Sequence, residues 1–590
     1  MVDRRVITAL ILSTFFCGAA NAQTLARLRD KYLDGLFRAK PHLATFMGDH
    51  RYDDRVVDLS PEALARREKI LVGLQAQARS LSPASLDERV DLEILRDGID
   101  LELLYLREIR DWEWDPRLYD SFPYYDPREI VAGRLSDIIH GDFAPEAERR
   151  KSVTAQLTAL PALLKQEIAA LDRSKKPGTR HVSREYADQA IKSNKGRIEF
   201  FEADVKDFCK ADNTCEKARQ SAVKALNEYS HYLETDVKPR ADGDWRLGKK
   251  LYAKKFPLAL QTTLTPDEVV PRAQKLFDES KKGLYAVARK LHHELWPKEP
   301  APPEQADAAT QKRVIERVKD EIAKDHPKPN ELVEAHARNL DALRAFIEQH
   351  RLLALPPRDT LVVEPMPGFK RGSTAAEYLP PGVLDRNPRW HATYYVDPID
   401  PTWPPERVES YLRGQNDYEV QLVAAHEAYP GHHTQYFYSK RNLNPLRAVL
   451  WNAPMVEGWA VYGEGLMVAL GWGGARNDRF RFYDLRGRMI VATNAILDVK
   501  LQSGEMTDDE AVRFMVDEGF QEKAMAEKKL LRAKLDSTQL AQYFLGLDEI
   551  DALERDYRKR GPFDQRKFNE ALIGQGSIAV KFLRRYLLGE

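Results

Sequence analysis

Apolar side chains recur at helical spacing through most of residues 24–350. Ser60 and Pro61 predict the start of one helix, because serine is a favoured N-cap and proline is tolerated at the first helical position. Within 64–74, and again within 94–109, apolar residues follow at the spacing that one buried helix face requires. This region is therefore expected to form packed helices whose apolar stripes make a core.

The pattern changes beyond residue 355, where two short runs rich in β-branched and aromatic residues predict strands. These runs are Thr360–Glu364 and Trp390–Val396, and each is ended by a segment that contains proline. Helical spacing then returns and continues to the C-terminus. We expect a mainly α fold with one small sheet, in which residues 23–354 form an N-terminal helical region and residues 355–590 a second region.

The chain begins with a pattern typical of a secretory signal peptide over residues 1–22. Two arginines precede the apolar run Val6–Ala20, and small residues predict cleavage after Ala22. An uncleaved membrane anchor is the alternative, although the apolar run is short for a membrane span. The residues before Cys17 form a poor lipoprotein signal, so we expect a periplasmic or secreted protein.

The charge balance argues against nucleic-acid and membrane partners. The full chain has 91 basic and 91 acidic residues, and removal of residues 1–22 leaves one more acidic residue than basic. A near-neutral chain gives no case for binding to nucleic acid or to an anionic membrane surface. No later segment is apolar for about 18 consecutive residues, so no further membrane span is expected.

Two cysteines, Cys209 and Cys215, remain after removal of the signal peptide. An even number of cysteines in an exported chain, close together in the sequence, favours a local disulfide. A redox or metal-binding pair is the alternative.

The highest concentration of potential metal ligands lies in the segment that begins at His426, His-Glu-Ala-Tyr-Pro-Gly-His-His. Zinc hydrolases hold the ion with two neutral imidazoles and a carboxylate, leave a fourth position open for water, and use an unligated Glu as general base. His426 and Glu427 begin the pattern H-E-x-x-H, but Pro430 stands at the second ligand position and cannot continue a helix. The resulting turn would bring His432 to that place, with His433 as the rival ligand.

Glu457 completes the inventory as the third expected ligand of a Zn²⁺ ion, with His426 and His432. Glu427 is the expected general base on zinc-bound water, and would pass the proton to the leaving amine. Glu464 lies seven residues past Glu457, on the same helix face. It is either a rival ligand or a carboxylate that accepts a hydrogen bond from a ligand His. The ordinary alternatives are polar core histidines and surface glutamates.

The segments His426–Gln435 and Glu457–Ala460 resemble a family of exported bacterial proteins catalogued as a domain of unknown function. That family is placed among the gluzincin-type metallopeptidases, relatives of thimet oligopeptidase and Taq carboxypeptidase. Glu457 lies 25 residues past His432, the distance at which gluzincins place their third ligand. The resemblance covers residues 355–590 well and the N-terminal helices more loosely. It implies a bilobal, gluzincin-like helical fold with the small β-sheet beside a deep active-site cleft.

The resemblance also implies groups that act on the substrate. Gluzincins commonly stabilise the developing oxyanion with a Tyr or His from a C-terminal helix, a role expected here for Tyr543, with Tyr462 as the second candidate. Gluzincins can pair an extended peptide with the edge strand of the small sheet. Trp390–Val396, which carries Tyr395, is assigned that role, with an ordinary buried strand as the alternative.

Other side chains have expected roles at the same site. Arg486 and Arg488 would hold a substrate carboxylate, as a carboxypeptidase needs, unless they are solvated or structural arginines. His433, if it is not a ligand, is expected beside the ligand set, as Glu464 is.

The expected function is zinc-dependent hydrolysis of peptide bonds in short peptides outside the cytoplasm. A helical shell that closes over the metal would limit access to chains without folded structure. A zinc hydrolase of a non-peptide amide or ester would use the same site and stays open. So does a non-catalytic exported helical binding protein, although a decayed site should have lost Glu427 or Glu457.

Overall fold

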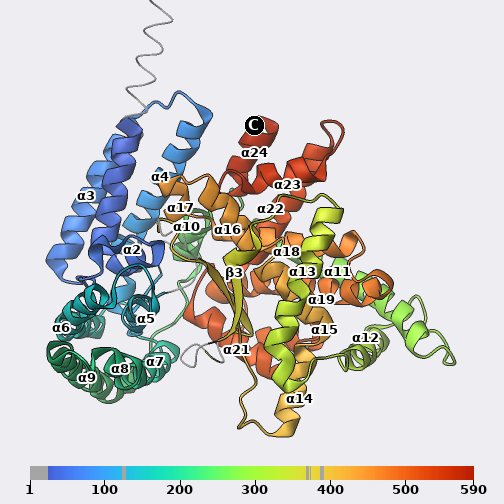
Figure 1. Ribbon diagram of the computed structural model, residues 1–590, viewed down its shortest axis with the longest axis horizontal. Coiled ribbons are helices and arrows are strands. Elements are labelled where there is room, and N and C mark those ends of the chain that lie inside the picture. The colour runs from blue at the N-terminus through green and yellow to red at the C-terminus, as the bar shows by residue number, and fades with distance from the viewer. Residues whose placement is uncertain (1–23, 122–127, 367–370, 372–373, 386–390) are drawn as a thin grey trace, which may run out of the picture. The chain divides into compact units, whose positions relative to one another are not determined.

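The protein is described by a computed structural model over residues 24–121, 128–366, 371, 374–385 and 391–590 (Figure 1). The described chain is mainly helical, with a two-stranded and a three-stranded sheet, which confirms the expected mainly α class. The signal peptide predicted over residues 1–22 lies outside the described residues. Within the described ranges, no helix has both the length and the apolar character that crossing a membrane requires.

The chain divides into two compact units, which are described separately. The first unit ends at Leu247 but also takes in Asn444–Trp451 and the short segment around 382–385. The predicted boundary at residue 354 therefore differs from the division in the structure. The reason is packing, because α11 (Pro266–Leu295) lies along α19 (Asn477–Gln502) and so belongs with the C-terminal helices.

The first unit is a set of packed helices with a small antiparallel sheet. As predicted, a helix begins at Pro61, where the side chain of Ser60 accepts the N–H of Ala63 at 3.3 Å. Cys209 and Cys215 form a disulfide, which confirms the predicted local bridge. The elements are a helix over 24–39, α2 (Pro41–Met47), α3 (Pro61–Ser80), α4 (Leu86–Leu104), β1 (Tyr119–Asp120), β2 (Arg128–Glu129), α5 (Ala132–His140), α6 (Glu146–Leu171), α7 (Arg184–Glu202), α8 (Asp204–Cys209), α9 (Asn213–Tyr232) and α17 (Pro445–Val449).

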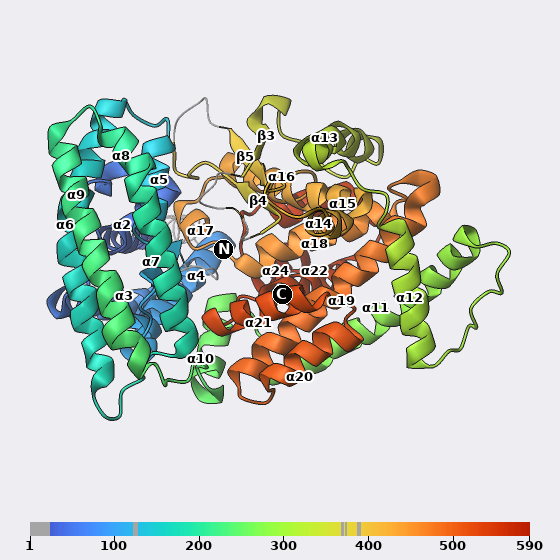
Figure 2. The same cartoon turned by 90° about the horizontal axis from the view of Figure 1, so that it is seen from below.

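The second unit holds all the predicted site residues. Its helices are α10 (Lys249–Leu260), α11, α12 (Ala308–Ile322), α13 (Leu332–Gln349), α14 (Pro405–Gly414), α15 (Asp417–Glu427), α16 (His432–Arg441), α18 (Ala453–Ala469), α19, α20 (Asp508–Arg513), α21 (Lys523–Leu535), α22 (Ala541–Arg558), α23 (Gln565–Ile573) and α24 (Val580–Leu588). α18 packs on α22, α22 on α19, and α19 on α11 (Figure 2). These helices bury α18 along most of its length.

The three-stranded sheet has the order β3 (Leu361–Pro365), β5 (Ala392–Val396), β4 (Ala376–Leu379). β5 pairs in parallel with β3 and antiparallel with β4, so it is the central strand. The prediction that the segment ending at Val396 is an edge strand for substrate is therefore wrong, because both of its edges are already paired. Trp390 lies outside the described residues. β4, which forms one of the two outer edges of the sheet, was not predicted.

The glycines of α18 are sites of close packing. Gly458 faces Gly546 of α22, and a Cβ on Gly546 would lie 2.7 Å from the Cα of Gly458. Gly463 faces Pro430, with 3.0 Å from an added Cβ to the proline Cγ. Gly465 lies against the guanidinium of Arg488 on α19. Three different neighbours therefore explain these glycines.

The crossing of α18 and α22 should be intolerant of a single added methyl group. Gly546→Ala would place a Cβ in overlap with the carbonyl oxygen of Pro454. We expect it to lower the free energy of unfolding by about 1–3 kcal/mol or more, since overpacking forces the helices apart. Gly487→Ala is the matched control on α19, where an added Cβ meets no atom within 4 Å. Chemical unfolding should show equal or higher stability for the control, and equal losses for both variants would contradict this account of the crossing.

Candidate metal centre

Two predicted ligands lie on either side of a sharp turn. α15 ends one residue after His426, the Tyr429–Pro430 peptide bond is cis, and α16 begins at His432. The predicted interruption of the helix at Pro430 is confirmed. A Cβ on Gly431 would overlap the carbonyl oxygen of His426, so the chain can fold back this tightly only with glycine at that position. The turn places the two imidazole rings 4.6 Å apart, centroid to centroid.

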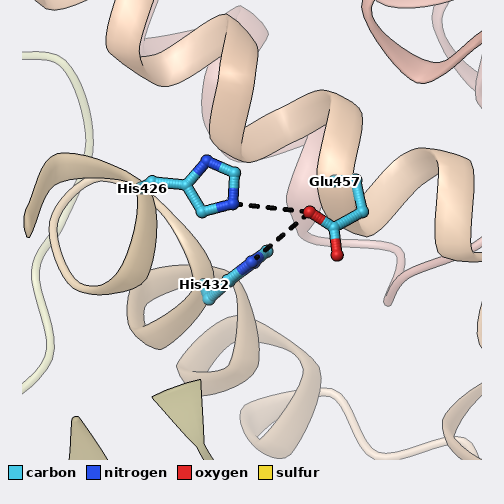
Figure 3. Close-up of side chains that lie close together, drawn as sticks. All are labelled: His426, His432 and Glu457. Atoms are coloured by element: carbon cyan, nitrogen blue, oxygen red, sulfur yellow. Dashed lines mark ion pairs between the residues drawn. The ribbon is translucent and has the colours of Figure 1, made fainter. Parts of the chain in front are cut away.

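α18 holds this turn at two points. The indole N–H of Trp459 donates to the carbonyl oxygen of Pro430 at 3.0 Å. Gly463, one helical turn further on, leaves room for the ring of Pro430. Both contacts fix α18 against the turn, and Glu457 lies two residues before Trp459. The carboxylate therefore reaches the two imidazoles from the opposite side (Figure 3).

His426, His432 and Glu457 form the candidate metal centre. The Nε2 atom of His426 lies 3.4 Å from Oε2 of Glu457, and Nε2 of His432 lies 3.7 Å from the same oxygen (Figure 3). The three ligand atoms all lie within 4.8 Å of one another. Ligand atoms about 2.1 Å from a tetrahedral zinc ion are separated from one another by about 3.4 Å. The donor types and their spacing therefore fit a divalent ion such as Zn²⁺.

The carboxylate of Glu464 orients the first imidazole. Its Oε1 atom accepts a hydrogen bond from Nδ1 of His426 at 2.7 Å. This bond keeps a proton on Nδ1, so Nε2, which faces Glu457, is the nitrogen that can bind an ion once it gives up its own proton. Glu464 thus lies where the sequence predicts a carboxylate that supports a ligand His. Glu457 rather than Glu464 shares the centre with His432.

The electrostatics of the three ligands are consistent with cation binding. Burial opposes ionisation of Glu457, but His426 and His432 hold its pKa below the ordinary value. Burial lowers the pKa of His432 to about 4, so this imidazole is neutral at neutral pH, as metal binding requires. Burial also acts against the charged form of His426, but Glu457 and Glu464 raise its pKa well above the ordinary value. An ion that binds here would displace a proton from His426.

His433, the rival ligand, points elsewhere. It is fully buried, with Nε2 lying 3.0 Å from the hydroxyl of Thr360 and Nδ1 lying 3.2 Å from the hydroxyl of Tyr378. These contacts connect α16 with β4 and with the residue before β3. His432 and His433 were the alternative ligands, and the geometry places His432 with His426 and Glu457.

Glu427 lies beside the ligands but outside their set. Its Oε2 atom accepts the backbone N–H of Tyr378 at 3.0 Å. Burial raises the pKa of Glu427 to about 7, and the charge of His426 acts in the opposite direction. Tyr378 and β4 were missed by sequence reasoning. The only signal was a third short run that ends at a proline pair, Pro380-Pro381, much as prolines follow the two predicted strands.

Tyr543 lies at the start of α22, one turn before the glycine that contacts α18. Its hydroxyl accepts a hydrogen bond from Nη2 of Arg532 at 3.1 Å. Burial raises the pKa of Tyr543, and the charge of Glu457 acts in the same direction. Tyr462, the second candidate, instead accepts a hydrogen bond from Gln565 of α23 at 2.8 Å.

The three predicted substrate-binding residues lie in different surroundings. Arg486 forms an ion pair with Glu419 at 2.8 Å. Arg488 is shared between Asp484 at 3.3 Å and Asp551 at 3.8 Å. Tyr395 lies on the central strand, on the face opposite Tyr394, because side chains alternate along a strand. Tyr394 faces α13, where its hydroxyl lies 2.6 Å from Nδ1 of His336.

Zinc content should separate the two adjacent histidines. His432→Ala removes a ligand candidate, so we expect purified protein to lose stoichiometric zinc, measured by metal analysis after gel filtration. His433→Ala removes only the contacts to Thr360 and Tyr378, and should keep the zinc while losing some stability. Zinc that persists in His432→Ala and vanishes in His433→Ala would overturn the assignment.

Two solved structures resemble nearly the whole chain. A candidate lipoprotein of unknown function from Shewanella oneidensis is 27% identical, with a TM-score of 0.79 over 96% of this chain and 99% of that one. A candidate lipoprotein from Colwellia psychrerythraea is 14% identical, with a TM-score of 0.76 over the same shares, a likeness that shows the fold alone. No match was found among curated proteins. Residues 41–587 match the family described as bacterial protein of unknown function, and the chain therefore belongs to the DUF885 family.

Proposed function

We propose that the protein is a zinc-dependent hydrolase that cleaves peptide bonds in short peptides outside the cytoplasm. One observation carries the proposal. Two imidazole nitrogens and a carboxylate oxygen converge at metal-ligand spacing, and a further carboxylate, that of Glu427, lies next to them without belonging to the set. This is the residue inventory of gluzincin-type peptidases, and their bilobal fold and deep cleft remain part of the proposal.

His426, His432 and Glu457 would hold the ion, which when bound would polarise the scissile carbonyl and lower the pKa of water. Glu427 would take a proton from the attacking water at a carboxylate oxygen and deliver it to the leaving amine. The N–H of Tyr378 orients this carboxylate from β4. Burial raises the pKa of Glu427 to about 7, close to the range in which a group can both accept and release a proton.

Tyr543 would stabilise the oxyanion of the reaction. A guanidinium can only donate hydrogen bonds, so the contact with Arg532 uses the oxygen of Tyr543 and leaves its O–H free to donate to another acceptor. An O–H held in this way can donate to the oxygen on which negative charge develops. Tyr462 is less suited to this role, because burial and a side-chain hydrogen bond to the carboxylate of Glu554 raise its pKa, and that hydrogen bond uses its O–H.

The outer edge of β4 would bind the peptide main chain. The N–H of Tyr378 points away from β5 and toward Glu427, so this edge runs past the catalytic carboxylate. An extended peptide added at such an edge gains main-chain hydrogen bonds with little sequence preference. The peptide-pairing role predicted for the segment that became β5 is thereby assigned to β4.

Export is supported by two features. The Cys209–Cys215 disulfide is typical of oxidising compartments. The Shewanella relative is described as a candidate lipoprotein. With the N-terminal pattern typical of a signal peptide, these features favour a protein that acts outside the cytoplasm.

Glu427→Gln should separate catalysis from metal binding. Because Glu427 lies outside the ligand set, the variant should keep its zinc, whereas turnover of a peptide library should fall by about 10²–10⁴-fold or more. Glu406→Gln, an exposed change on α14, is the control and should match the unchanged protein. Ester and non-peptide amide panels assayed in parallel test the substrate class. Zinc binding with no turnover in any form would identify a binding protein instead.

Tyr543→Phe should lower kcat by about 10²–10³-fold with a smaller change in KM, since the lost hydrogen bond forms to the transition state. Tyr462→Phe provides a matched control. It should leave kcat unchanged and cost about 1 kcal/mol of stability through the lost contact with Gln565. Steady-state kinetics with one good peptide substrate measures both variants. A larger kcat loss for Tyr462→Phe would reverse the assignment.

A further inference from the structure

Three cationic side chains gather beside the candidate metal centre. α21 carries Lys529 and Arg532 three residues apart, so both lie on one face of the helix. α21 packs against α19, which carries Arg486. Burial lowers the pKa of Lys529 to about 7, and the charges of Arg532 and Arg486 act in the same direction, because the three head groups are close together.

Arg532 connects this cationic cluster to the metal centre. Its Nη2 atom donates to the hydroxyl of Tyr543 at 3.1 Å. Tyr543 lies on α22 one turn before Gly546, which packs against Gly458 of α18, the residue next to Glu457. The cluster therefore lies on the side of the centre that carries the proposed oxyanion donor.

The members of the cluster differ in their partners. Arg486 is paired with Glu419 at 2.8 Å. Lys529 has no ion pair with a carboxylate in the described part of the chain, and the charges that act on it most strongly are both positive. A partly buried ammonium among like charges destabilises the folded state unless an anion approaches it. Such an arrangement is favoured where a ligand brings the missing negative charge.

We propose that Lys529, together with Arg532 and Arg486, binds a carboxylate of the substrate. The inference rests on the proposed function and deepens it by naming the group that the site recognises. Two guanidinium forks and an ammonium supply several charge-assisted donors for one carboxylate. In a short peptide this is either the free C-terminal carboxylate or an acidic side chain near the scissile bond. The role predicted for Arg486 is kept, and Lys529 and Arg532 join it in place of Arg488.

Equilibrium binding tests this subsite independently of turnover. The zinc-loaded Glu427→Gln protein, with and without Lys529→Met, is titrated by calorimetry with three probes. They are N-acetyl-trialanine with a free carboxylate, its C-terminal amide, and the same amide with a central glutamate. We expect Lys529→Met to weaken binding of a carboxylate-bearing probe by about tenfold and to leave the trialanine amide unchanged. Whichever acid is affected identifies the source of the carboxylate.

Two further variants serve as controls. Lys523→Met, on the same helix but exposed, should leave all three affinities unchanged. Lys529→Arg keeps the charge and should retain the preference, which shows that Lys529→Met acts through charge and not through misfolding. Equal weakening of all probes, no weakening, or no binding at all would overturn the inference. A carboxylate preference without hydrolysis by the unchanged protein would instead contradict only the proposed function.

Discussion

The candidate site depends on how closely α18 can approach its neighbours. Gly458 and Gly463 have no side chain at the two places where α22 and the ring of Pro430 touch this helix. Each helical glycine destabilises the helix by about 1 kcal/mol relative to alanine, so the packing energy of the close contacts must exceed this loss. They set the distance between the carboxylate of Glu457 and the two imidazoles. The indole of Trp459 then fixes the angle by its hydrogen bond to the turn.

Two neighbouring carboxylates acquire different properties from their surroundings. Glu457 faces two imidazoles, which hold its pKa low despite burial. Glu427 has one backbone N–H as its partner, and burial raises its pKa to about 7. An ionised group suits a ligand, whereas a group that titrates near neutrality suits proton transfer. The difference between the two pKa values follows from local packing, although both glutamates lie at or beside the same candidate metal centre.

Local rules were enough to predict the break at Pro430, the disulfide and the helical class, because each depends on residues close together in the sequence. They favoured His432 over its rival His433, but only the packed structure shows which of these two adjacent side chains of α16 faces Glu457. The resemblance to gluzincins put the segment ending at Val396 at a sheet edge, and local rules could not correct this, because strand order depends on partners far along the chain. Arg532 and Lys529 drew no notice for the same reason. Arg532 comes close to Tyr543, and Lys529 to Arg486, only when α19, α21 and α22 pack together.

The three ligand candidates come from two helical segments that meet only in the native fold. The turn between α15 and α16 supplies the imidazoles, and α18 supplies the carboxylate. A disordered chain offers no such preformed cage, so capture of an ion would follow folding and make the native state more resistant to unfolding as the free ion becomes more abundant. The identity of the bound cation would then depend on which ions are available in the compartment where the polypeptide folds, rather than in the one where it is synthesised.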